Sequence, residues 1–334
     1  MTALAPHLSI YLREHLPRER AVSPHTVKTY ANCFVLLVQF AADRLKRRPT
    51  DLEVEDLDTD MIMAFLDHVE IGRGSCVRTR NGRLAAIRSF FRYIEYRIPA
   101  CLDQALRVRA IPTKKTDKAL IDYLDRAEIK ALLDTPDPRT RLGTRDRAML
   151  HLTYAGGLRV SELVTLQLGD FPDRSLSTMH IMGKGRRERV LPLWKETQIA
   201  LRAWLAIRPQ VEVTEIFLNA NGQPMTRDGF AFRLAEHVKT AATKQPSILG
   251  KRVTPHVLRH SCAMHTLAAT GDIRKVALWL GHASIQSTET YLRADPEEKL
   301  QILAAHGAPA IKPGRFKPPS DALITMLTDV RRRA

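Results

Sequence analysis

An arginine and a glutamate spaced three residues apart form the first candidate site for chemistry in the chain. Arg159 and Glu162 lie in GGLRVSELVTL, residues 156–166. On a helix this spacing places both side chains on one face, so the carboxylate could hold the guanidinium in a fixed orientation. An ordinary surface ion pair has the same spacing and is the structural alternative. The pair therefore indicates a function only where other catalytic residues accompany it.

A second candidate site lies at the start of a predicted helix, in TPHVLRHSCAMH, residues 254–265. A threonine cap is followed by proline at the first helical position. His256 and Arg259 fall three apart in the first turns, where backbone N–H groups and the helix dipole also favour an anion. The segment thus predicts a phosphate-binding corner. His256, His260 and His265 could instead ligate a metal, but without a nearby acidic ligand or cysteine pair we expect no metal site.

A basic turn, GKGRRER, supplies the third candidate, Lys184, at the tip of a predicted hairpin. A charged surface turn is the structural interpretation, but a mobile lysine can also donate a proton to a leaving oxygen. The turn is not a Walker P-loop, because its Gly-Lys pair is followed by glycine and lacks the upstream glycine. We therefore expect no nucleotide cofactor.

The fourth candidate is a tyrosine nine residues after a histidine, in LGHASIQSTETYLRA, residues 280–294. Gly281 predicts the end of one helix, and a turn and a second helix follow it. Alone, Tyr291 fits an ordinary core residue, because an unperturbed phenol has a pKa of about 10. Beside His282 and other activating groups, the same hydroxyl could act as a nucleophile.

The charge of the chain favours a nucleic-acid partner. Its 334 residues include 52 Lys and Arg against 36 Asp and Glu, a formal net charge of +16. Such an excess is typical of proteins that bind DNA or RNA, although basic proteins also bind anionic membranes or are simply kept soluble by their charge. The four cysteines form no CxxC pair, which argues against a zinc ribbon and a disulfide framework. The sequence has neither a membrane-length apolar run nor a signal-peptide pattern, so we expect a cytoplasmic protein.

Residues 1–107 predict a helical domain. Residues 23–45 begin with a serine cap and proline and continue with apolar residues at spacings of three and four. Residues 58–70 and 78–97 predict two further helices. The arginines of the last one suit a helix that contacts phosphates, although a solvated face would carry them too. They are Arg78, Arg80, Arg83, Arg88 and Arg92.

Residues 120–306 predict a second domain, after a proline-containing, charged linker at 108–119. Residues 175–194 predict two short strands joined by the basic turn, which is the pattern of a β-hairpin. The predicted helices span about 125–136, 144–158, 226–243, 255–270, 273–280, 285–291 and 295–305. The expected fold class is therefore mainly α, with a small β-sheet or hairpin in the second domain.

All four candidate segments occur together in one known family. GLRVSEL, GKGRRERVLPL, HVLRH and LGHASIQSTETY stand in the order, and near the spacing, of the tyrosine recombinases, the phage-integrase family with its Xer-like members. SPHTVKTYANCFVLLVQF and RTRNGRLAAIRSFFRY also resemble the helical, SAM-like core-binding domain of that family. The chain resembles a Xer-like tyrosine recombinase over nearly its whole length.

This resemblance implies a role for each candidate residue. The matching positions are Arg159 as the first catalytic arginine, Glu162 as its supporting acid, Lys184 as the hairpin lysine, His256 and Arg259 as the H-x-x-R pair, His282 as the second histidine and Tyr291 as the nucleophile. The six core positions hold the family's usual residue types, so we expect an active enzyme. No metal or other cofactor is implied.

Phosphoryl transfer to a tyrosine explains these residue types. Arg159 and Arg259 would clamp the non-bridging oxygens of the five-coordinate phosphorus, and His282 would add a hydrogen bond. His256 would position or deprotonate the phenol, and Lys184 would protonate the departing 5′ oxygen. The 3′-phosphotyrosyl intermediate retains the energy of the broken bond, so that resealing needs only a 5′-hydroxyl.

The resemblance also implies partners and an assembly. The partners are double-stranded DNA recombination sites, bound by a homotetramer, or by a heterotetramer with a related recombinase, that passes through a Holliday junction. Residues 1–107 would bind one face of the duplex and residues 120–306 the other, as a two-domain clamp that the linker closes. Residues 307–334 form a tail that would supply a helix to a neighbouring protomer or contact DNA. No membrane partner is expected.

Two other functions remain open at this point. A type IB topoisomerase uses the same phosphotyrosine chemistry on one strand without exchange, although the small helical domain and the motif spacing disfavour it. A catalytically silent site-specific DNA-binding protein would keep the fold without the reaction. For an active recombinase, the biological role could be resolution of chromosome dimers or integration and excision of a mobile element.

Overall fold

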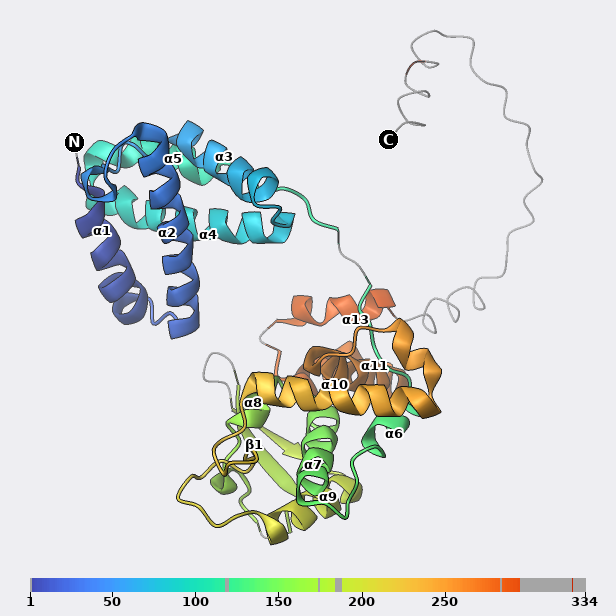
Figure 1. Cartoon of the computed structure of the whole chain (residues 1–334). Helices are drawn as coiled ribbons and strands as arrows, with labels where there is room; N and C mark the ends of the chain where they lie inside the picture. The colour runs from blue at the N-terminus through green and yellow to red at the C-terminus, as the bar shows by residue number, and fades with distance from the viewer. Residues whose placement is uncertain are drawn as a thin grey trace. The chain divides into compact units, whose positions relative to one another are not determined.

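The computed structural model describes residues 2–117, 120–173, 175–183, 188–282 and 284–294, together with Met326. The chain divides into two compact units, Met1–Lys118 and Ala119–Ala334 (Figure 1). Each has its own hydrophobic core. Within the described residues, none of the helices is both long and apolar enough to cross a membrane.

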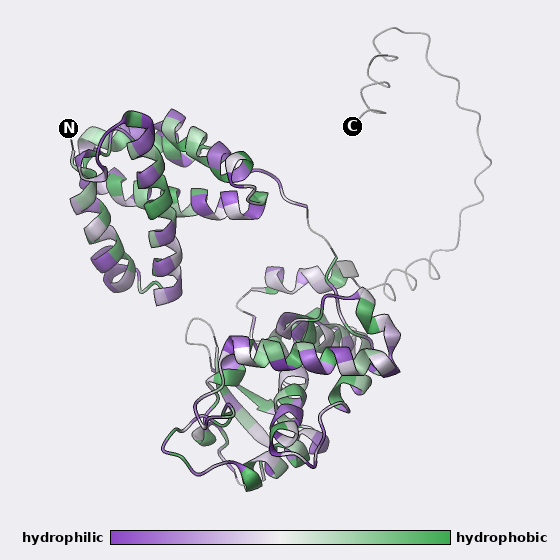
Figure 2. Ribbon diagram, in the orientation of Figure 1, coloured by the Kyte–Doolittle hydropathy of each residue, from purple (hydrophilic) through white to green (hydrophobic). Residues whose placement is uncertain are grey.

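The first unit is built from helices packed around an aromatic core. Its elements are α1 (Leu4–Ile10), a π-helix (Tyr11–Glu19), α2 (Pro24–Leu45), a 3-10 helix (Pro49–Asp51), α3 (Thr59–Asp67), a π-helix (His68–Gly72), α4 (Val77–Arg97), a 3-10 helix (Pro99–Cys101) and α5 (Leu102–Ala110). Hydrophobic and hydrophilic residues are mixed along these helices (Figure 2). In the core between α2 and α4, the rings of Phe34 and Phe90 meet edge to face, with their centroids 5.4 Å apart.

The predicted N-terminus of α2 is confirmed in detail. Ser23 is the cap, and its hydroxyl accepts a hydrogen bond from the backbone N–H of Thr26 at 3.3 Å. Proline follows at the first helical position, where the missing N–H has no helical partner to lose. The predicted linker at 108–119 starts too early, because α5 continues to Ala110 and buries Val108 in the core.

Not every arginine of α4 is on the surface. Arg78 and Arg92 are exposed. Arg80, however, is only 2% exposed and lies 3.6 Å from Glu70, and Arg88 donates a hydrogen bond to the backbone carbonyl of Ile111. The expectation that the whole set suits phosphate contact is therefore wrong for Arg80, since a buried cation needs a partner inside the protein.

The described part of the second unit is mainly helical and contains one β-hairpin. Its elements are α6 (Arg126–Leu133), α7 (Arg141–Ala155), α8 (Val160–Val164), a 3-10 helix (Leu168–Asp170), β1 (Thr178–Met182), β2 (Glu188–Pro192), α9 (Lys195–Ile207), α10 (Arg227–Lys244), a 3-10 helix (Pro246–Gly250), α11 (Pro255–Thr270), α12 (Ile273–Leu280), a 3-10 helix (Ile285–Ser287) and α13 (Glu289–Ala294). The strands are antiparallel, with Met179 opposite Leu191. The expected fold class, mainly α with a small hairpin, is confirmed.

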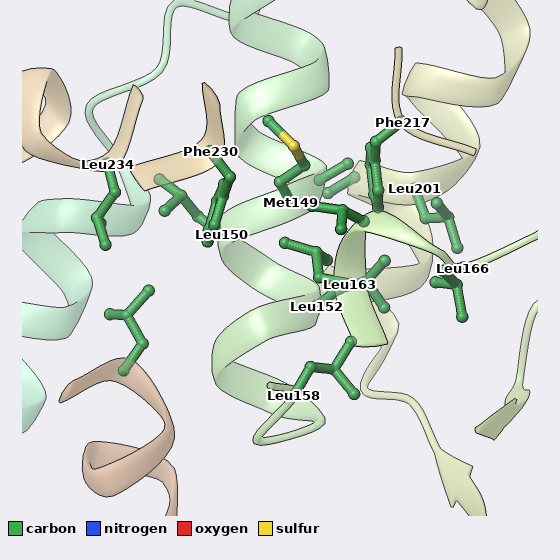
Figure 3. Close-up of a cluster of buried hydrophobic side chains, with 14 of the residues drawn as sticks. Met149, Leu150, Leu152, Leu158, Leu163, Leu166, Leu201, Phe217, Phe230 and Leu234 are labelled. Atoms are coloured by element: carbon green, nitrogen blue, oxygen red, sulfur yellow. The ribbon is translucent and has the colours of Figure 1, made fainter. Parts of the chain in front are cut away.

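The core of this unit forms around α7. Met149, Leu150 and Leu152 extend from it between Phe230 of α10 and Phe217 of the segment before that helix (Figure 3). All five side chains are at most 1% exposed. Since buried apolar area is the main source of stability, this packing fixes α7 and the turn that follows it, which leads into Arg159.

Two sequence predictions in this unit need correction. The helix α9 was not predicted, because it follows directly on the strand pattern that ends at Trp194, and Trp194 at its N-terminus provides no capping side chain. The helix predicted at 285–291 is a 3-10 turn followed by α13, which starts at Glu289. The helix predicted at 295–305 and the tail at 307–334 lie outside the described residues, apart from Met326.

A buried carboxylate ties α7 to α10. Asp146 is 1% exposed, and one of its oxygens accepts hydrogen bonds from the Nε and Nη2 atoms of Arg145, at 2.9 and 2.7 Å. The other oxygen lies 2.7 Å from Nε of Arg233 and 2.9 Å from Nε2 of His237. Burial raises the pKa of Asp146, but the bond with His237 and the charge of Arg145 outweigh it, and the pKa lies below its usual value.

Asp146→Asn is expected to lower the free energy of unfolding by about 3–5 kcal/mol, because it leaves buried cations without their counter-ion. The depressed pKa means that Asp146 stabilises the protein above the unfolded pKa and loses this effect as pH falls. The difference in free energy of unfolding between wild type and Asp146→Asn should therefore shrink on acidification. Urea unfolding at pH 7 and at about pH 2, below the ordinary carboxyl pKa of 3.8, measures it. Asp137→Asn, which alters an exposed pair with Arg139, is the control and should change little.

Candidate active site

One carboxylate organises the arginines of the site. Glu162, in α8, is 7% exposed, and its Oε1 accepts a hydrogen bond from Nη1 of Arg159 at 2.7 Å. Its Oε2 accepts from the backbone N–H of Arg159 at 2.9 Å and from Nη2 of Arg189, in β2, at 2.8 Å. Burial raises the pKa of Glu162, but Arg189 and then Arg159 outweigh it, so its pKa is below the usual value. Glu162 is therefore a fixed anion between guanidiniums.

Arg259 reaches the same place from α11. It is 2% exposed, and its Nη1 lies 4.0 Å from Oε2 of Glu162. It donates hydrogen bonds to the backbone carbonyls of Gly157 and, at 2.8 Å, Leu280. Burial, followed by the charge of Arg159, lowers the pKa of Arg259 to about 10, which still leaves it charged at neutral pH. Several guanidiniums thus share one carboxylate, and an anion bound there would offset the excess charge.

His282 follows α12 and is held by a buried threonine. Its Nδ1 lies 2.7 Å from the hydroxyl oxygen of Thr288, which is fully buried. Burial, then the charges of Arg259 and Arg159, lowers the pKa of His282 to about 4, so the ring is neutral at neutral pH. When the Thr288 hydroxyl donates to Nδ1, the ring proton is on Nε2, which can donate to a phosphate oxygen.

Tyr291, on α13, is both a buried residue and part of the site. It is 2% exposed and packs in a cluster with Cys262 and Leu280. Its ring is nearly parallel to that of His282, with centroids 6.3 Å apart, and its hydroxyl lies 3.1 Å from Nδ1 of His260. Burial raises the pKa of Tyr291 to about 12, although the charge of Arg259 opposes this rise. The phenol is therefore protonated at rest.

Of the other two sequence candidates, His256 is described by the structure and Lys184 is not. His256 lies in the first turn of α11 and keeps part of its surface exposed; its ring lies 4.7 Å from that of His260 between centroids. Its partial burial and the charge of Arg259 lower its pKa. Lys184 lies outside the described residues, between β1 and β2. The structure thus brings together Arg159, Glu162, Arg259, His282 and Tyr291, with His256 linked to them through His260.

Three residues of the site were missed as such by the sequence prediction. Arg189 is inside the basic hairpin motif, where strand alternation could have placed it on the inner face. His260 was considered only as a metal ligand, and Thr288 carried no signal. Of the proposed metal ligands, His260 contacts Tyr291, and His265 bonds the hydroxyl of Tyr154 at 2.8 Å. The described part of the chain holds no group of three or more metal-ligating side chains.

Gly281 lies against Arg189 and immediately before His282. Its φ is +63°, and a Cβ on it would come within 2.9 Å of Cδ of Arg189. Gly281→Ala is therefore expected to slow DNA cleavage by about tenfold or more, because it displaces both neighbours and about 1.4 kcal/mol of lost transition-state stabilisation is tenfold in rate. Single-turnover cleavage of a nicked DNA site measures this effect.

Gly271 offers a matched control for this substitution. Its φ is +59°, but no described atom lies within 4 Å of a Cβ placed on it. Gly271→Ala should therefore cost stability through its backbone, about 1–3 kcal/mol, as Gly281→Ala does, without slowing cleavage. Equal slowing by both variants would show that the contact with Arg189 does not matter to the reaction.

The family models cover both units of the chain. Residues 122–298 match the phage integrase family, and residues 11–97 match the phage integrase N-terminal SAM-like domain. An inferred integrase/recombinase of Sinorhizobium fredii is 40% identical over 328 residues, 98% of each chain. The tyrosine recombinase XerC of Myxococcus xanthus is 35% identical over 310 residues, 90% of this chain and 97% of the relative.

Solved structures share the fold at lower sequence identity. The XerH site-specific recombinase, in a post-cleavage complex with a palindromic difH substrate, is similar with a TM-score of 0.64 and 21% identity, over 88% of this chain and 83% of that one. A lambda integrase dimer bound to a COC′ core site gives a TM-score of 0.63 at 17% identity, over 93% and 80%. These structures show that the fold is shared. The family models and the relatives show that the chain belongs to the phage integrase family, the tyrosine recombinases.

Proposed function

We propose that the chain is a site-specific DNA recombinase that cuts and rejoins double-stranded DNA through a covalent bond to Tyr291. The observation that carries the proposal is the convergence of Arg159, Arg259 and His282 beside the buried hydroxyl-bearing ring of Tyr291, within one unit. In a tyrosine recombinase this set provides cations and a hydrogen-bond donor for the phosphodiester oxygens, and a hydroxyl group to attack the phosphorus.

Each described group has a distinct task in the proposed reaction. The guanidiniums of Arg159 and Arg259 bind the non-bridging oxygens, where negative charge grows in the five-coordinate transition state. His282 donates from Nε2 to the same oxygens. Tyr291 attacks phosphorus, and Lys184, whose role rests on the sequence motif alone, protonates the departing 5′ oxygen. From the sequence, His256 is predicted to assist the phenol.

The stoichiometry of strand exchange supports a tetramer. Two duplexes recombine by cleavage of four strands, and each covalent intermediate uses one tyrosine. A chain that supplies one nucleophile must therefore act as four copies, either identical or mixed with a related recombinase. Cleavage of one strand pair at a time passes through a Holliday junction.

The two units divide the work in this proposal. Residues 1–110 bind the duplex, residues 120–306 carry out the chemistry, and residues 307–334 provide the contact between protomers. The net charge of +16 supports binding to the phosphate backbone. The cytoplasm is the proposed compartment, since the substrate is DNA. The relatives' names favour recombination over topoisomerase activity, and the described site residues favour catalysis over silent binding.

The proposed function is tested with the wild-type protein and with DNA sites selected by their binding to it from a randomised pool. Duplexes bound from this pool are sequenced, and the enriched site is rebuilt with a nick beside the scissile position, so that cleavage traps the covalent state. We expect a 3′-linked protein–DNA adduct that mass spectrometry maps to Tyr291, and recombinant products from plasmids carrying two sites. Relaxation of site-free plasmid without exchange would indicate a topoisomerase, and binding without an adduct a silent protein.

A further inference from the structure

His260 is the described side chain that hydrogen-bonds the hydroxyl of Tyr291. It follows Arg259 directly on α11, and its Nδ1 is 3.1 Å from the phenol oxygen. The two rings meet edge to face, with centroids 5.6 Å apart at an interplanar angle of 65°. The contact thus joins α11, which carries one of the arginines, to α13, which carries the nucleophile.

The protonation states of the pair allow the phenol to donate this hydrogen bond. Burial raises the pKa of Tyr291 to about 12, so the phenol holds its proton at neutral pH. Burial, then the charges of His256 and Arg259, lowers the pKa of His260 to about 4, so its ring is neutral and one nitrogen has a free lone pair. With the ring proton on Nε2, Nδ1 accepts the hydrogen bond from the phenol.

His256 does not lie next to the Tyr291 hydroxyl. It lies one helical turn before His260, is exposed, and contacts the ring of His260 at 4.7 Å between centroids. The order of contacts in the described structure is therefore His256, His260 and then Tyr291. A proton that leaves the phenol meets His260 first.

We propose that His260 is a catalytic residue that accepts the Tyr291 proton during cleavage and returns it during ligation; this inference rests on the proposed role of Tyr291 as nucleophile. In cleavage, the phenol O–H bond breaks, its proton passes to Nδ1 of His260, and the phenol oxygen forms a bond to phosphorus. The bond from phosphorus to the 5′ oxygen breaks, and that oxygen takes a proton from Lys184. Ligation reverses each transfer.

Binding of DNA would activate this base. The charge of Arg259 is one of the influences that keep His260 neutral, and Asp122 opposes them. A phosphodiester held by Arg159 and Arg259 brings a negative charge that offsets the guanidinium and makes Nδ1 more basic. The histidine would then take a proton only when the scissile phosphate is in place, which limits activation of the nucleophile to the DNA complex.

The experiment compares two reactions of the full-length protein. The first is formation of the adduct on the nicked site, which needs the phenol proton to leave. The second is ligation, in a Tyr291→Phe background, of a DNA strand that ends in a 3′-p-nitrophenyl phosphate. A 5′-hydroxyl attacks the phosphorus and p-nitrophenolate leaves without taking a proton. This reaction therefore does not involve the tyrosine or its proton. The second reaction still needs the arginines and His282.

His260→Phe should slow adduct formation by about a hundredfold or more, because general-base catalysis contributes on that scale. It should leave ligation of the nitrophenyl strand within about threefold of the Tyr291→Phe parent. His260→Asn places an amide oxygen near the position of Nδ1, so it can accept the hydrogen bond but cannot take the proton, and it should remain slow in adduct formation.

His151→Phe is the matched control, because His151 is another largely buried histidine of the same unit whose pKa burial lowers to about 4. It should leave both reactions unchanged. Equal slowing of both reactions by His260→Phe would show a structural role and overturn the proposal, as would wild-type rates in His260→Phe or His260→Asn. Absence of an adduct from the wild type would instead refute the proposed function itself.

Discussion

Tyr291→Phe is expected to abolish formation of the covalent protein–DNA adduct, a loss of about 10⁴-fold or more in cleavage rate, as for removal of other enzymic nucleophiles. In the proposed reaction the phenol oxygen forms the bond to phosphorus, and phenylalanine has no oxygen to take its place. DNA binding should persist, because the guanidiniums of Arg159 and Arg259 are untouched. Gel separation of adduct from free protein, with binding measured at the same salt concentration, checks both parts.

Tyr154→Phe is a closely matched control for this change. The Tyr154 hydroxyl also bonds a histidine of α11, since it lies 2.8 Å from Nδ1 of His265, and burial raises its pKa to about 12. Both variants lose a phenol–histidine hydrogen bond, which should cost about 1–3 kcal/mol of stability in each case. Only Tyr291→Phe should lose the adduct. An adduct formed by Tyr291→Phe would show that another residue is the nucleophile.

Local sequence signals were enough to predict most of the helices and their order. The serine that caps α2, the threonine and proline that begin α11, and the glycine that ends α12 are short-range features whose energetics need few distant contacts. Helix α9 was missed because the strand pattern that precedes it leaves no separate start signal. The boundary of α5 depends on burial of Val108, which is decided by packing.

The site was predictable as a set of residue types but not as a set of contacts. Arg259 binds the carbonyl of Gly157, about a hundred residues away in the chain, and Arg189 reaches Glu162 from a different element. Such pairs form only when α7, α8, β2 and α11 pack together. The contact between His260 and Tyr291 likewise arises from the packing of α13 on α11, and spacing along the chain gives no sign of it.

Glu162→Gln is expected to lower the cleavage rate by about 10²–10³-fold, the usual loss when the groups that stabilise transition-state charge are no longer held in place. An amide at this position keeps one acceptor oxygen but turns an N–H group towards guanidiniums that can only donate. Arg159 and Arg189 would each lose part of their support, and Arg259 its nearby charge. The free energy of unfolding should fall by about 3–5 kcal/mol, because buried cations lose their counter-ion.

Glu128→Gln separates the loss of a buried carboxylate from the loss of the site. Glu128 is fully buried and accepts hydrogen bonds from Lys251 at 2.6 Å and Ser247 at 2.7 Å. This variant should be destabilised to a similar degree yet cleave at nearly the wild-type rate. Sulfate gives a further distinction: it should raise the melting temperature of Glu162→Gln more than that of wild type or Glu128→Gln, because an anion can replace the missing charge between the arginines. Equal sulfate effects in all three proteins would mean that these guanidiniums do not form an anion site.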